Sequence, residues 1–297
     1  MSEFTTLHTV ETLTIYGSGL ASLNGFASLR EVTGPLRLFE FDETLDLTGL
    51  NGVERARDVR ISRFEGFYSF DALSGLIEAS LITFDSSSDL VRISGFDSLT
   101  SVDVVRVTWL PLLYEIEAFA NVQSMSELEL VRVPRLVLAE GFLGLTQIDE
   151  LELDDVGLTS LNSFSNLADV GSITVTNSGF LKEFGSFAPQ TCNNMILRDN
   201  EGLDSLLGPQ TLTELDRLEI EDCGALVKLD GLETVEEIDE LILVRNSGLT
   251  SIDSMSSLQV VGNFTATFNR GLGDDYLLDF VDDLTSVNHV TITGNGP

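Results

Sequence analysis

The stretch that decides the fold is LEIEDCGALVKLDGLETVEEIDE, residues 218–240. Its apolar residues stand at positions 1, 3, 9, 12, 15, 18 and 21, namely Leu218, Ile220, Leu226, Leu229, Leu232, Val235 and Ile238. Positions 1 and 3 alternate with polar neighbours, as in a strand with one buried face. The later positions recur every third residue, which suits short extended pieces, turns or single helical turns. A long α-helix would need mixed steps of three and four.

The same pattern recurs along the chain, and we call each repeat a coil. The strand-like starts are Leu13, Leu36, Val59, Ile82, Val105, Leu128, Leu151, Ile173, Met195, Leu218, Leu241, Phe264 and Val290. Successive starts are 22 or 23 residues apart, except for a last step of 26. Because one coil cannot bury its own apolar face, we expect neighbours to stack, with position 1 beside position 1 in a long parallel sheet. The sequence therefore predicts a mainly β fold, a right-handed parallel β-solenoid of leucine-rich-repeat type with about twelve coils, and residues 1–297 as a single domain.

The repeat resembles a known family. The segment LILVRNSGLTSI, residues 241–252, is similar to the leucine-rich-repeat-like L domains of cell-surface receptors and of related bacterial and fungal wall proteins. The resemblance covers nearly the whole chain, although the cysteine-rich caps and modules of those receptors are missing and the coils outnumber those of one such domain. It implies a secreted or surface-displayed recognition module and names no ligand.

Both ends fall inside the repeat. Phe4, Leu7 and Val10 fit positions 15, 18 and 21 of a coil that would begin before residue 1, and Val290 begins a coil that does not continue. One interpretation is an excerpt of a longer chain, or end-to-end stacking through open strand edges. The other is that irregular terminal residues cover those edges.

The composition excludes several classes of protein. The chain has 48 acidic and 16 basic residues, a net charge of −32, so its surface repels nucleic-acid backbones and anionic lipid. A run of about 18 apolar residues, which a membrane span would need, does not occur. The opening MSEFTTLHTV shows no signal peptide. Two histidines and two cysteines indicate no dense metal site and no disulfide scaffold, and we expect Cys223 to be a buried free thiol.

Catalytic motifs are missing from the sequence. It contains no Ser/His/Asp set, phosphate-binding loop, dinucleotide fingerprint or HExxH motif, so we expect neither an enzyme nor a cofactor, and assign no catalytic residue and no metal ligand. Asp154 and Glu221 belong to outward rows of carboxylates, which could serve a polysaccharide-acting enzyme or bind calcium. The alternative is a solvated acidic face.

A candidate ligand-binding patch lies in the first five coils. Its residues are Arg37, Phe39, Arg60, Arg63, Arg106 and Trp109. Arg37, Arg60 and Arg106 share outward position 2, and Phe39 holds outward position 4. Arginines beside aromatic side chains are typical of contact surfaces. The alternative is that these arginines pair with the surplus acids.

Three functional hypotheses remain. The first is a non-enzymatic recognition or adhesion module, extracellular or on the cell surface, that binds a protein or glycan and neither binds nucleic acid nor inserts into a membrane. The second is a structural subunit that self-associates end to end into a fibre. The third is a polysaccharide-acting β-helix enzyme that uses the carboxylate face.

Overall fold

The computed structural model describes residues 4, 6–17, 19–41, 45–207 and 211–296. The chain is mainly β, and parallel sheet forms a β-solenoid of about twelve turns, which confirms the predicted fold class. It divides into two compact units, residues 1–146 and 147–297, and each is described by itself. That the whole chain forms one domain stays a prediction. Within the described ranges, every helix is too short or too polar to cross a membrane.

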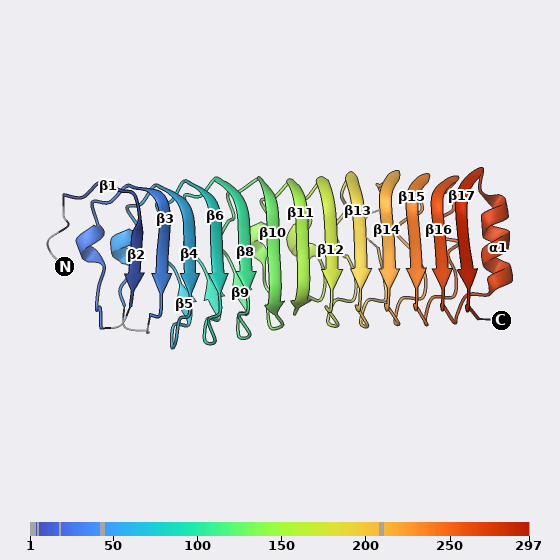
Figure 1. Ribbon diagram of the computed structural model, residues 1–297, viewed down its shortest axis with the longest axis horizontal. Coiled ribbons are helices and arrows are strands. Elements are labelled where there is room, and N and C mark those ends of the chain that lie inside the picture. Colours follow the sequence, from blue (N-terminus) through green and yellow to red (C-terminus); the bar gives the residue numbers. More distant parts are fainter. Residues whose placement is uncertain (1–3, 5, 18, 42–44, 208–210, 297) are drawn as a thin grey trace. The chain divides into compact units, whose positions relative to one another are not determined.

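The first unit contains a parallel sheet in the order β1–β3–β4–β6–β8–β10, with β2 also paired to β3 (Figure 1). Its strands are β1 Thr9–Val10, β2 Leu13–Tyr16, β3 Glu31–Phe39, β4 Arg55–Ser62, β6 Glu78–Asp85, β8 Ser101–Thr108 and β10 Ser124–Val133. A smaller parallel sheet consists of β5 Ser69–Phe70, β7 Arg92–Ile93 and β9 Glu115–Ile116. Short 3-10 helices are η1 Asn24–Phe26, η2 Thr48–Leu50 and η3 Glu140–Phe142.

The second unit has the same architecture within itself, with strands in the order of the sequence (Figure 1). They are β11 Gln147–Val156, β12 Asp169–Thr176, β13 Thr191–Arg198, β14 Glu214–Glu221, β15 Glu237–Val244, β16 Val260–Thr267 and β17 Ser286–Thr293. The 3-10 helix η4 Asn162–Phe164 and the α-helix α1 Asp274–Asp283 also belong to this unit.

The register of the sheets follows the repeat, as predicted. Leu36 lies opposite Val59, Val59 opposite Ile82, and Ile82 opposite Val105. Positions 1 and 3 are buried in every coil from the first to the twelfth, counted from Leu13. Each buried valine, leucine, isoleucine, methionine or phenylalanine among them contributes about 2 kcal/mol through removal of apolar surface from water.

A left-handed corner follows the strands. Position 5 has a φ between 51° and 59° in each coil from the second to the twelfth, at Glu40, Arg63, Ser86, Trp109, Arg132, Asp155, Asn177, Asp199, Asp222, Arg245 and Phe268. None of these residues is glycine, so the corners cannot be recognised from glycine placement. The corner turns position 5 outward and returns position 6 to the core.

Position 6 forms a polar ladder in the second unit. The Asn246 side chain accepts a hydrogen bond from the Cys223 N–H at 3.0 Å and donates one to the Ile220 carbonyl at 2.7 Å. Asn269 repeats this arrangement one coil later. Cys223 is a buried free thiol, as predicted, and burial raises its pKa to about 12. The ladder thus satisfies buried backbone groups that would otherwise destabilise the turn.

The structure differs from the sequence-based expectation in two elements. From β3 on, the strands paired in the long parallel order, which excludes β5, β7 and β9, have eight to ten residues. Each includes the end of the preceding coil, where the alternation is interrupted. Position 21 and position 1 both point inward across two outward residues, so a search for strict alternation detects only the second half. The last coil contains the ten-residue helix α1, which accounts for its 26-residue step. Beyond it, β17 pairs with β16 and with no other strand among the described residues, and Val290 is 40% exposed.

Candidate recognition face

Two arginines lie side by side on the outward face of the sheet in the first unit. Arg37 of β3 is the register partner of Arg60 of β4. On either side of this pair the same row contains Thr14 and Thr83. Neighbouring parallel strands are about 4.8 Å apart, so the two arginine side chains extend from adjacent strands at that spacing. Arg37 is half-buried and Arg60 is exposed.

Ion pairs in this protein commonly join residues exactly one coil apart in register, because equal positions stack on adjacent strands. Pairs separated by 23 residues are Arg55–Glu78, Arg63–Glu40, Arg92–Glu115, Arg106–Glu129, Arg198–Glu221, Arg217–Glu240 and Arg245–Asp222. The same offset from Arg37 and Arg60 reaches only threonines or the other arginine. Among the described residues, no carboxylate forms an ion pair within 4 Å of either. Asp58 stands two residues before Arg60 on β4, diagonal to Arg37, and Asp85 is diagonal to Arg60.

Aromatic rings adjoin the arginine pair. Phe39 follows Arg37 by two residues on the same face of β3 and pairs in register with Tyr16 of β2. The centroids of the two rings are 5.7 Å apart. Tyr16 is exposed and Phe39 is half-buried. We call Tyr16, Arg37, Phe39 and Arg60 the arginine face.

Arg106 lies on the same row but is already neutralised. It stands on β8, two strands beyond Arg60. Its guanidinium contacts the Glu127 carboxylate at 2.8 Å and the Glu129 carboxylate at 3.0 Å. Glu129 is one coil further along in the same position, so adding the repeat length to Arg106 identifies this partner from the sequence.

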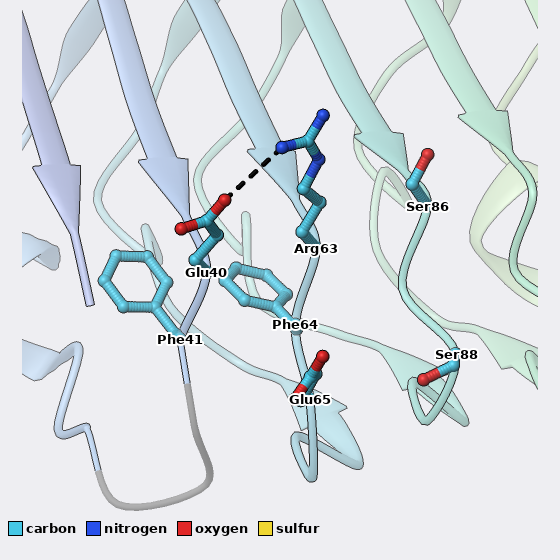
Figure 2. A pocket seen from close by; sticks show the side chains of 7 residues that line it. All are labelled: Glu40, Phe41, Arg63, Phe64, Glu65, Ser86 and Ser88. Carbon is cyan, nitrogen blue, oxygen red and sulfur yellow. Dashed lines mark hydrogen bonds and ion pairs between the residues drawn. The ribbon is translucent and has the colours of Figure 1, made fainter. Parts of the chain in front are cut away.

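Arg63 and Trp109 do not stand on the sheet face. Both occupy left-handed corners after their strands. Arg63 pairs with the Glu40 carboxylate at 3.3 Å beside an open pocket of about 500 Å³, where Phe41 and Phe64 lie below the pair (Figure 2). Those two phenylalanines stack with ring centroids 5.3 Å apart and are buried in the core at position 6.

Trp109 already has a cationic neighbour at the next corner. The guanidinium carbon of Arg132 lies 3.8 Å from the centroid of its ring, a cation–π contact. Of the six candidates, the structure therefore brings together Arg37, Phe39 and Arg60, with Tyr16 beside them. It places Arg106 two strands farther along the row. Arg63 and Trp109 lie just beyond the C-terminal ends of β4 and β8.

The outward carboxylates of the second unit are engaged with their neighbours. Asp154 accepts hydrogen bonds from Thr176 at 2.7 Å and Asn177 at 2.6 Å. Glu221 forms ion pairs with Arg198 and Arg245. Within the described part of the chain, no three histidine, cysteine or acidic side chains are grouped as metal ligands would be.

Glu219 is 3% exposed and lies between two arginines. Burial alone would raise the pKa of this carboxyl, but hydrogen bonds from Arg198 and Arg217 lower it, and the net pKa lies below its ordinary value. The Arg217 Nε donates to Glu219 at 2.9 Å. This group is therefore a buried, charged crosslink of β13 and β14, with its oxygens occupied by protein donors.

Comparisons with known proteins place the chain in no family. No family model matches it, and no curated protein matches it. Among solved structures it is similar to a chain of the crystal structure of a TLR13–ssRNA13 complex. That match has 10% sequence identity, covers 92% of this chain and 79% of the other, and has a TM-score of 0.15. At this TM-score the similarity carries no argument about function.

Proposed function

We propose that this chain is a non-enzymatic recognition or adhesion module, displayed outside the cell, that binds an acidic group of a glycan or protein through the arginine face. The observation that carries the proposal is the adjacent pair Arg37 and Arg60, which has no carboxylate partner within 4 Å among the described residues. The resemblance to receptor L domains supports the surface location.

The physical argument rests on charge. Like charges directly opposite each other on adjacent strands are destabilising. The chain has 48 acidic residues that could pair with these arginines, yet none of those described does so within 4 Å. An anion between the two guanidinium groups relieves the repulsion and receives charge-assisted, bidentate hydrogen bonds. A carboxylate or sulfate group of a ligand fits this requirement.

The neighbouring rings supply a second kind of contact. Tyr16 and Phe39 form an apolar platform beside the charges, on which a sugar ring or an apolar side chain can stack. Away from this face the surface is mostly acidic and repels anions, which favours binding of the ligand here. Charge and platform together favour one orientation of the bound group.

The test is a binding panel with paired variants. Immobilised sulfated, uronic-acid and neutral glycans and acidic peptides are probed with wild-type protein and with Arg37→Ala/Arg60→Ala. Two lost charge-assisted contacts should weaken binding to an anionic member by about a hundredfold. The control, Arg55→Ala/Arg92→Ala, removes the same charge from arginines already paired with Glu78 and Glu115, and should bind as wild type. Equal losses in both variants, or binding only to neutral glycans, would contradict the proposal.

A further inference from the structure

A second exposed row lies on another side of the first unit. Tyr68, Val91, Tyr114 and Val137 occupy position 10 of four consecutive coils, and we call them the tyrosine ladder. The Val91 N–H donates to the Tyr68 carbonyl at 2.9 Å, the Tyr114 N–H to Val91 at 2.8 Å, and the Val137 N–H to Tyr114 at 3.0 Å. The four residues therefore lie side by side on neighbouring strands or bridges.

The side chains of the ladder face solvent. Tyr68 is 61% exposed, Tyr114 45% and Val137 43%, while Val91 is half-buried between the two tyrosines. Positions 9 and 12 on either side of the row point into the core, so the ladder contributes little to internal packing. A contiguous exposed apolar row on a soluble protein indicates a contact surface.

The row alternates large and small residues. Because valine is smaller than tyrosine, this alternation leaves a notch over Val91 between the two tyrosine rings and a second notch over Val137, with Tyr114 as its one wall in the row. The notches are two strand spacings apart, about 9.6 Å at ~4.8 Å per strand. In a polyproline II helix, residues i and i+3 lie on one edge about 9.3 Å apart, at ~3.1 Å per residue. An extended strand places same-face residues only about 6.7 Å apart, which does not fit the notches.

The rim of the ladder is acidic. Asp71, Asp89 and Glu117 flank the row two or three residues from its members. The nearby cations are Arg92, which is paired with Glu115 and Glu117, and Arg135, two residues before Val137. This excess negative charge favours a cationic partner over a neutral or acidic one. An arginine of such a partner can also stack on an exposed tyrosine ring.

We infer that the tyrosine ladder binds a basic, proline-rich segment of a partner protein in the polyproline II conformation. Two residues three apart enter the notches over Val91 and Val137, Tyr114 lies between them, and a terminal arginine reaches the acidic rim. This surface involves none of the residues of the arginine face, so it stands or fails independently of the proposed function.

The first experiment measures binding of a fluorescent peptide, RPPVPPVPPR, by anisotropy. A peptide of the same composition, RPPVPVPPPR, has its valines two residues apart, and EPPVPPVPPE reverses the terminal charges. We expect RPPVPPVPPR to bind about tenfold more tightly than either control, more weakly as salt rises. Equal binding of the two spacings, or no binding of RPPVPPVPPR, overturns the inference.

The second experiment locates the site. Tyr68→Ser/Tyr114→Ser removes two exposed rings and should weaken RPPVPPVPPR binding by about tenfold. Phe180→Ser removes a ring that is 62% exposed in the second unit and should leave binding unchanged. Unchanged thermal unfolding shows that each variant is folded. Equal loss in both variants overturns the inference, as does binding of cellohexaose instead of the peptide with the same tyrosine dependence, which would identify a glycan site.

Discussion

Ser86 occupies the left-handed corner after β6, with a φ of 55°. For a non-glycine residue, the left-handed conformation costs about 1 kcal/mol of folding free energy. Glycine removes this strain, although its larger conformational entropy in the unfolded state offsets part of the gain. We therefore expect Ser86→Gly to raise the free energy of unfolding by about 0.5 kcal/mol. Ser88→Gly, two residues on at an exposed position without a positive φ, should lower it by about 0.5 kcal/mol. Urea unfolding of both variants checks this, and equal changes would contradict the strained corner.

Glu219 makes acid stability a test at the same scale. Its folded-state pKa lies below the ordinary value, so its contribution is complete above the unfolded pKa and is lost as pH falls through the folded pKa. Glu219→Gln should lower the free energy of unfolding by about 2 kcal/mol at neutral pH. The difference from wild type should shrink as the pH is lowered into the acid range.

The matched control is Glu201→Gln, at an exposed position. Its stability should follow that of the wild type at every pH in urea unfolding. A difference between wild type and Glu219→Gln that is constant with pH would show that Glu219 does not titrate in this way.

At the scale of the strand, Arg37 and Arg60 should reduce stability while Arg106 increases it. Arg60→Thr continues the threonine row of Thr83 and removes a like-charge contact, so we expect a gain of about 0.5 kcal/mol, largest at low salt. Arg106→Thr leaves Glu127 and Glu129 without their shared cation and should lose about 1 kcal/mol. Thermal unfolding across salt measures both, and a loss of stability in Arg60→Thr would contradict the uncompensated pair.

Elements differed in how far the sequence predicted them. The buried positions 1 and 3 and their register follow from the 23-residue phase, because equal positions must stack. The first half of each strand was missed, since position 21 and position 1 face inward across two outward residues. Helix α1 interrupts the repeat, and Leu277 alone of its residues is fully buried, so the third-residue spacing gave no signal for it.

For the whole molecule, the charges are unevenly distributed. The first unit has 10 basic and 21 acidic residues, net −11, and the second has 6 and 27, net −21. The sequence predicted the region of the candidate site but not which arginines were free. The position-2 row identified Arg37 and Arg60 correctly as neighbours. Arg63, Arg106 and Trp109 each have a partner one coil away, at an offset that the repeat itself supplies. For the four candidate arginines, the one-coil offset separates Arg37 and Arg60 from Arg63 and Arg106.

The central claim, that Arg37 and Arg60 form the anion-binding pair, is tested most directly by the arginine side-chain NMR signals. The protein, labelled with ¹⁵N, is titrated with the tightest-binding anionic member of the panel. The account predicts that the Nε–H signals of Arg37 and Arg60 shift together and saturate, while those of Arg63 and Arg106, which already contact carboxylates, stay in place. Shifts at Arg106 without shifts at Arg37 and Arg60, or small unsaturable shifts at all arginines, would contradict it.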